Sequence, residues 1–275
     1  MSTTMLVPTS AAPYAEPDLA ALENLALPCD DDTPMENTWH RLQINLLDDV
    51  IHQHWRGRTD FYVGGNMFVY YSLEQVKTKD YKGPDLFVVK DVDGSYPRPC
   101  WVAWQEGGRL PDFIVELLSE STMDEELGRK KQLYERVFRT LEYVCYGPDP
   151  TQGTEPMLRA WKLVNGRYEE VLPDARGWIW STQLEAWLGI WEGSYAGVRT
   201  RWLRLFDAQG QLVPTAAEAE HQRAEAERQR AEAAEQRAAL ERERAEAAKR
   251  RAEEAERKLA ELQAELARLR AQRSE

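Results

Sequence analysis

Two short apolar runs, each beginning at Pro-Asp, constrain the fold of this chain more than any other feature. The first is Gly83–Val89 (GPDLFVV) and the second is Pro111–Leu118 (PDFIVELL). Both patterns predict β-strands that follow a turn. Alternate side chains of a strand project to the same face, so Glu116 should share a face with Ile114. An acidic residue amid such apolar neighbours is costly to bury without a partner, which makes Glu116 a candidate functional residue.

Acidic residues offered by two neighbouring strands suit a hard cation such as Mg²⁺, because such cations prefer oxygen ligands. A metal-dependent nuclease also needs a group that activates water or stabilises the charge on the attacked phosphate, and a lysine can do either. In the common nuclease arrangement this lysine lies two residues after the second acid, where this chain has Leu118. Lys130 is the candidate for the role of the missing lysine. On a helix it would share a face with Tyr134, four residues further on. If that face meets the sheet, Lys130 can reach back to Glu116, whereas Lys131 points about 100° away.

The charge of the chain counts against a simple nucleic-acid binder, because phosphate contacts need Lys and Arg. The formal net charge is −12, and residues 216–275 carry 14 basic and 15 acidic residues, so a charge of −11 falls on residues 1–215. A DNA-cutting body would therefore need a local basic groove on an acidic surface.

The sequence has the features expected of a protein of a reducing cytoplasm. No apolar run approaches the roughly 18 to 20 residues of a membrane span, and the N-terminus lacks the regions of a signal peptide. The three cysteines, Cys29, Cys100 and Cys145, are odd in number and share no CxxC spacing. They predict neither a disulfide framework nor a structural zinc site.

Composition and periodicity predict three segments. Residues 1–34 are rich in Pro, Ala, Ser, Thr and Asp and are typical of a loosely ordered arm. Residues 35–214 combine helical patterns, near residues 37–55 and 124–138, with several strand patterns. They predict an α/β (α+β) domain in which helices flank a mixed sheet. The predicted strands and hairpins lie near residues 60–63, 67–71, 86–89, 113–118, 142–146, 158–171 (turning at Asn165-Gly166) and 203–213.

Residues 215–275 form a long helical tail with a heptad pattern. A basic residue recurs every seven positions and is followed each time by a small or apolar residue. These pairs begin at Arg223, Arg230, Arg237, Arg244, Arg251 and Lys258. An apolar repeat of 3.5 residues predicts a coiled coil, and the strongest seam consists of Leu259, Leu262, Leu266 and Leu269. We therefore expect self-association or binding of a partner helix through residues 216–275; a solvated single helix, held by Glu/Arg pairs, is the alternative.

Several of these motifs occur together in the order and spacing of a known family. They are Pro84-Asp85, the segment Pro111–Thr122 (PDFIVELLSEST), Lys130 before Tyr134, Glu142-Tyr143 and Gly147-Pro148-Asp149. From about Pro34 to Pro214 the chain resembles the Uma2 family of restriction endonucleases, which is found in cyanobacteria and other bacteria. That family belongs to the PD-(D/E)XK nuclease superfamily, so the resemblance implies a restriction-endonuclease-like mixed sheet flanked by helices.

The resemblance also implies roles for particular residues. Asp85 would be the Pro-Asp metal ligand, Glu116 the second acidic ligand, and Lys130 the catalytic lysine, relocated to the helix. Some members of the superfamily add a carboxylate from the first helix, for which Glu36, Asp48 and Asp49 are candidates. Where many members have Val and Pro after the acidic residue, this chain has Leu117 and Glu120, which leaves the acidic ligands intact.

The expected function is a DNA endonuclease that hydrolyses phosphodiester bonds with Mg²⁺ or Mn²⁺. The coiled coil would join two bodies, each offering one site. The alternative is an inactive nuclease-like scaffold that binds protein or nucleic acid through its coiled coil. The negative charge of residues 1–215 and the leucine, in place of a lysine, at position 118 favour this second hypothesis.

Overall fold

The computed structural model describes residues 37–72, 74, 75, 83–119, 123–147, 153 and 155–272, without the side chains of residues 267 and 269–272. The predicted arm and the candidate acid Glu36 lie outside the described residues, as do Ser121, Thr122, residues 148–150 and the side chain of Leu269. The chain divides into two compact units, Met1–Thr215 and Ala216–Glu275. None of the helices in the described part of the chain is both long and apolar enough to cross a membrane.

The first unit is a mixed α/β fold, which confirms the predicted fold class. Its helical elements are α2 (Thr38–His54), η1 (Ala103–Gln105), α4 (Met123–Glu125), η2 (Glu126–Lys130), α5 (Lys131–Leu133) and η3 (Tyr134–Phe138). Its strands are β1 (Phe61–Gly65), β2 (Val69–Tyr70), β3 (Leu86–Lys90), β4 (Trp101–Val102), β5 (Phe113–Leu117), β6 (Glu142–Gly147), β7 (Met157–Val164), β8 (Arg167–Val171), β9 (Ile179–Ser181), β10 (Ala186–Tyr195) and β11 (Val198–Phe206).

A six-stranded sheet in the order β1-β3-β5-β6-β7-β8 forms the centre of the unit. Strands β5 and β6 are parallel, and the other neighbours in this sheet are antiparallel. A parallel pair needs a crossover connection, and the helical segment from α4 to η3 supplies it. The β7–β8 hairpin turns at Asn165 and Gly166, both with positive φ (50° and 79°), as the sequence predicted.

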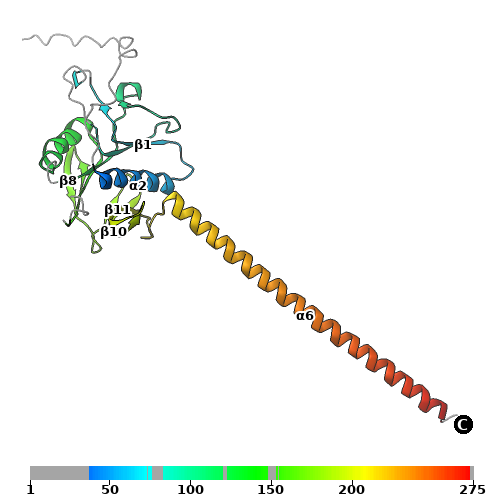
Figure 1. The fold of residues 1–275 in the computed structure, drawn as a ribbon. Coiled ribbons are helices and arrows are strands. Elements are labelled where there is room, and N and C mark those ends of the chain that lie inside the picture. The colour runs from blue at the N-terminus through cyan, green and yellow to red at the C-terminus, as the bar shows by residue number, and fades with distance from the viewer. Residues whose placement is uncertain are drawn as a thin grey trace, which may run out of the picture. The chain divides into compact units, whose positions relative to one another are not determined.

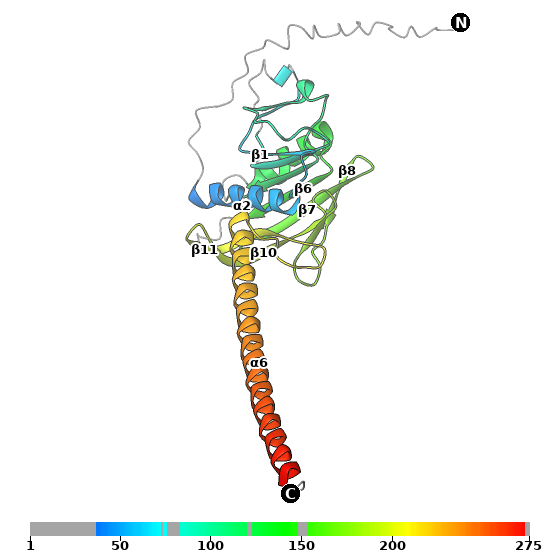
Figure 2. The same ribbon diagram turned by 90° about the vertical axis from the view of Figure 1, so that its right-hand side faces the viewer.

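One face of this sheet packs against α2. Helix α2 begins after Asn37, whose side chain accepts a hydrogen bond from the backbone N–H of His40 (2.9 Å). Its apolar residues share a core with Val88, Val115 and Val144 of the sheet. Figures 1 and 2 show α2 between the six-stranded sheet and a smaller sheet of β9, β10 and β11, whose Leu203 belongs to the same core.

The other face of the sheet packs against the helical crossover. Ile114 and Tyr143 point to this side and join Tyr134 and Phe138 of η3 in a second core. Within the crossover, η2 and η3 are π-helical turns, a geometry that is uncommon and often found at functional sites. The alternation along β5 therefore sends Val115 to the α2 side and its neighbours Ile114 and Glu116 to the crossover side.

The small sheet corrects one predicted hairpin. Strand β11 pairs along its length with β10, and the turn between them contains Ala196 and Gly197, both with positive φ. The predicted hairpin over residues 203–213 was therefore wrong in its main pairing. The chain does turn at Asp207–Gly210, and a single bridge, Phe206 to Leu212, spans this turn. Strand β10 (AWLGIWEGSY) was not recognised from the sequence.

The second unit is one continuous helix, α6 (Ala216–Gln272), of 57 residues. Charged side chains pair along it, as in Arg228–Glu225 (2.8 Å). Leu259, Leu262 and Leu266 lie along the predicted seam and are each more than half exposed.

Candidate active site

The register of two antiparallel strands brings Asp85 and Glu116 together. Leu86 of β3 pairs with Val115 of β5. Asp85, just before β3, therefore faces Glu116. Two hydrogen bonds join these positions reciprocally. The backbone N–H of Asp85 donates to Glu116 Oε2 (3.3 Å), and the backbone N–H of Leu117 donates to Asp85 Oδ2 (2.6 Å). The two acidic side chains therefore occupy one end of the β3–β5 pair.

Glu116 is completely buried and is held by groups from the crossover helix. Its Oε1 accepts a hydrogen bond from the Tyr134 hydroxyl (2.6 Å) and lies 3.2 Å from Lys130 Nζ. Lys130 and Tyr134 are four residues apart, and both reach the same carboxylate oxygen. These contacts agree with the predicted helix face, while Lys131 points elsewhere and stacks on Trp161 (4.1 Å).

Asp85 connects this cluster to α2 on the other face of the sheet. His40 Nε2 lies 3.2 Å from Asp85 Oδ2, and both side chains are at least nine-tenths buried. The first helix thus contributes an imidazole at this position. Of the candidate acids on that helix, Asp48 lies 3.4 Å from His52 Nδ1, with half of its side chain exposed.

A third acid, Glu126, lies in the same cluster. Its Oε1 is 2.9 Å from Lys130 Nζ, so one ammonium group bridges Glu126 and Glu116. The backbone carbonyl of Glu126 accepts a hydrogen bond from the Tyr143 hydroxyl (3.0 Å), which anchors η2 to the sheet. Glu126 Oε2 is buried and has no hydrogen-bond partner among the described residues. Sequence reasoning missed Glu126, although its spacing of four residues from Lys130 on a helix was a usable signal.

Burial and mutual repulsion govern the charges of this cluster. Burial raises the pKa of the Glu116 carboxyl well above its ordinary value, against the opposing charge of Lys130. Burial likewise raises the pKa of Glu126 to about 7. Burial also acts to raise the pKa of Asp85, but the neighbouring His40 side chain, the charge of Lys130 and the backbone N–H of Leu117 outweigh it and leave that pKa lowered. Burial alone would lower the pKa of Lys130, but the three acids raise it above its ordinary value and keep the ammonium charged.

Asp112, the other Pro-Asp acid, lies at the opposite end of β5 and serves the fold. Its Oδ2 accepts a hydrogen bond from the backbone N–H of Lys90 (2.8 Å) and lies 3.4 Å from a guanidinium nitrogen of Arg109. This side chain therefore secures the start of β5 and takes no part in the cluster.

The donor atoms of the cluster fit a divalent cation in kind. No three His, Cys, Asp or Glu side chains in the described part of the chain are arranged as a ready-made metal site. Mg²⁺, however, usually takes only one or two protein carboxylates and completes its shell with water and substrate phosphate. Asp85 and Glu116 supply that number, and Glu126, which contacts the same lysine, carries an oxygen without a partner among the described residues.

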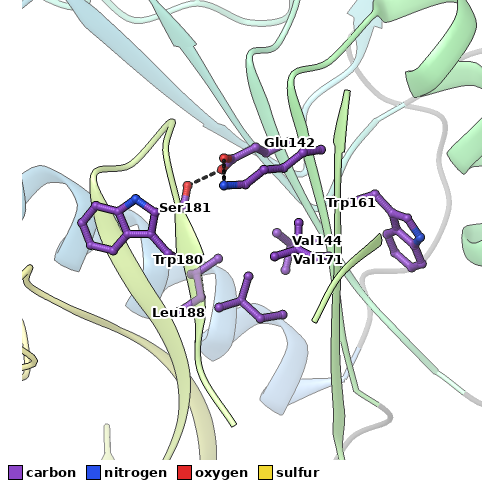
Figure 3. Close-up of a pocket in the computed structure, with 10 residues that line it drawn as sticks. Glu142, Val144, Trp161, Val171, Trp180, Ser181 and Leu188 are labelled. Atoms are coloured by element: carbon purple, nitrogen blue, oxygen red, sulfur yellow. Dashed lines mark hydrogen bonds and ion pairs between the residues drawn. The ribbon is translucent and has the colours of Figure 1, made fainter. Parts of the chain in front are cut away.

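A separate small pocket lies on the other face of the sheet (Figure 3). The acidic group that lines it, Glu142, has a full set of partners. The carboxylate accepts hydrogen bonds from the Ser181 hydroxyl, the Thr182 hydroxyl (2.5 Å) and the Thr182 backbone N–H (2.8 Å), and it pairs with Lys162 (3.5 Å). Apolar side chains such as Val144 and Leu188 line the remainder of this pocket. It is therefore a packing contact between the six-stranded and the three-stranded sheet.

Comparison with known proteins gives the family. Residues 31–192, more than half of the chain, match the Uma2 family, described as "Putative restriction endonuclease". Among solved structures, the chain is similar to a "putative nuclease belonging to DUF820" from Anabaena variabilis ATCC 29413, at 11% identity and a TM-score of 0.38. That alignment covers 60% of this chain and 89% of the other. No curated protein matches. The chain thus belongs to the Uma2 family, as its motifs predicted.

Proposed function

We propose that this protein is an endonuclease that hydrolyses phosphodiester bonds of DNA with Mg²⁺ or Mn²⁺, and that Asp85, Glu116 and Lys130 carry the reaction. The observation that supports it most is the contact between Lys130 Nζ and Glu116 Oε1 (3.2 Å), beside the hydrogen-bonded Asp85. Two acids and a lysine meet there. The lysine comes from the helical crossover and not from the strand position where it commonly lies.

Each side chain would have a distinct role. Asp85 and Glu116 would hold the cation, which when bound supplies positive charge at the scissile phosphate and lowers the pKa of a nearby water. Lys130 is held charged by its acidic neighbours, so it suits stabilisation of the developing phosphate charge better than proton abstraction. Tyr134 and His40 would orient the Glu116 and Asp85 carboxylates through their contacts.

The reaction itself is a hydrolysis. In-line attack forms a bond between the water oxygen and phosphorus, and the bond from phosphorus to the leaving oxygen breaks. The water releases one proton to solvent, and the leaving oxygen takes one up. The cluster contributes the geometry and the charges for this exchange.

Cleavage of supercoiled plasmid DNA by the full chain tests the proposal. We expect nicking or linearisation in Mg²⁺ or Mn²⁺ that EDTA stops, and loss of cleavage in Asp85→Asn, Glu116→Gln and Lys130→Met. Glu125→Gln, an exposed change in the turn before Glu126, is the matched control and should cut like the wild type. Full activity in all three cluster variants would refute the mechanism.

A second candidate function is an interaction scaffold, in which α6 is the working part. The specific observation is the exposed seam of Leu259, Leu262 and Leu266, which suits pairing with the same helix of a second copy. If the chain neither binds Mn²⁺ nor cuts nucleic acid, yet sediments as a dimer, the scaffold becomes the better account.

A further inference from the structure

We propose that Glu126 is a third carboxylate of the cation site and that the Lys130 ammonium holds the place of the divalent cation until that cation binds. This inference rests on the proposed function, because it assigns the cation to the Asp85–Glu116 end of the sheet. It adds one ligand, Glu126, and one movement, the release of Lys130 from its two acidic partners.

The contacts of Lys130 are those of a substitute cation. Its Nζ bridges Glu116 Oε1 (3.2 Å) and Glu126 Oε1 (2.9 Å), and its charge also acts on Asp85. These are ammonium–carboxylate separations, longer than the roughly 2.1 Å of an Mg²⁺–oxygen bond. The cluster is therefore spaced for an ammonium group, and a metal ion would need its carboxylates to close in.

Glu126 carries a buried carboxylate oxygen that a cation can use. The side chain is 7% exposed, and its Oε2 has no hydrogen-bond partner among the described residues. A buried carboxylate oxygen without a partner is costly, so a cation that engages it would recover that cost. Neighbouring Asp124 and Glu125 are exposed, so burial distinguishes Glu126 from the other acids of the same turn.

The charges of the cluster favour replacement of the Lys130 ammonium by a divalent cation. Lys130 contacts two acids, Glu116 and Glu126, and a third acid, Asp85, acts on its charge from beside them. A divalent cation in place of the ammonium would match their negative charge more closely. Lys130 is 16% exposed, so its flexible stem has a route toward solvent. Once released, its ammonium would be free to meet a substrate phosphate, which couples cation binding to substrate recognition.

The position of these groups on η2 fits such an exchange. Glu126 and Lys130 are the first and last residues of a π-helical turn, so a change of contact at one end bears directly on the other. The Tyr143 hydroxyl donates to the Glu126 backbone carbonyl (3.0 Å), which holds the backbone of η2 at Glu126 against the sheet.

Calorimetric titration of the full chain with Mn²⁺ tests the ligand. We expect Glu126→Gln to weaken Mn²⁺ binding by about tenfold or more, as loss of a metal-site residue commonly does. Glu125→Gln should bind like the wild type. Unchanged affinity in Glu126→Gln would overturn this inference and leave the proposed function intact. Absence of Mn²⁺ binding in the wild type would instead refute the cation-dependent function itself.

Acylation of lysines by a water-soluble reagent tests the movement without any variant. Lys130 should react slowly in EDTA and severalfold faster in saturating Mg²⁺, as followed by mass spectrometry of its peptide. Lys131, on the next position and stacked on Trp161, is the internal control and should not change. Equal labelling of Lys130 with and without bound Mg²⁺ would show that its ammonium is not displaced.

Discussion

Lys130→Met should destabilise the protein strongly at alkaline pH and weakly at acidic pH. The substitution keeps the length of the side chain but leaves Glu116 and Glu126 without the ammonium that contacts both, at 3.2 and 2.9 Å. Removing one partner of a buried ion pair costs about 3–5 kcal/mol, because the remaining charge is desolvated and uncompensated.

The pH dependence follows from the raised pKa of the two acids. Without Lys130, their pKa in the folded state would lie further above the ordinary value of 4.5, so the unfolded chain releases these protons first as pH rises. Stability should therefore fall as pH increases above that value. The variant can avoid a buried charge by protonating a carboxyl, at about 1.4 kcal/mol for each pH unit above the ordinary pKa. We expect a loss of about 1–2 kcal/mol at pH 5.5 and about 3–5 kcal/mol at pH 8.5.

Urea denaturation in EDTA, followed by tryptophan fluorescence, gives the free energy of unfolding at both pH values. The double variant Lys130→Met, Glu126→Gln should lose less stability than Lys130→Met, because one of the orphaned acids is gone. A loss below about 1 kcal/mol at pH 8.5, the size seen for surface ion pairs, would contradict the bridging role of Lys130. So would a loss of the same size at both pH values.

Three further predictions test other parts of the molecule. Glu142→Gln should lower the free energy of unfolding by about 1.5–3 kcal/mol, because the buried Glu142 carboxylate accepts several hydrogen bonds from residues 181–183. Urea denaturation measures this loss, and an unchanged free energy would show that the contact between Glu142 and residues 181–183 does not stabilise the fold. The Asp48 hydrogen bond raises the pKa of His52, so that pair should contribute up to about 1 kcal/mol below pH 6.5 and lose this contribution as pH rises through the raised pKa. Melting of wild type and Asp48→Asn should converge at pH 8.5, and a difference that persists there would contradict the assignment. Replacement of Leu259, Leu262 and Leu266 by serine should convert a dimer to a monomer in sedimentation equilibrium, whereas a monomeric wild type would refute pairing through α6.

Local sequence determined much of the candidate site. The two Pro-Asp strands predicted β3 and β5, and strand alternation placed Glu116 on the same side as Ile114. Helical spacing placed Lys130 and Tyr134 on one face, and both do contact Glu116. These features depend on periods of two and about four residues, which are visible in the order of the amino acids.

The tertiary structure decided which groups complete the cluster. His40 reaches Asp85 from a helix on the opposite side of the sheet, and no local pattern joins positions so far apart. Glu126 was overlooked because three acids in a row read as the charged first turn of a helix, and only packing separates the buried one from its exposed neighbours. The small sheet was misread for a different reason: β10 and β11 form a local hairpin, but its turn at Ala196-Gly197 lacks the Asn-Gly or Asp-Gly signal of such turns.

The sequence by itself determined the kinds of chemical groups available, the strands and helices that carry them, and the family. Only the tertiary structure decided that Glu116 and Glu126 contact one lysine and that Asp85 lies beside Glu116. That arrangement depends on the β3–β5 register and on the packing of η2 against the sheet. Such long-range contacts are selected by the burial of the whole core, so they cannot be inferred from any single segment.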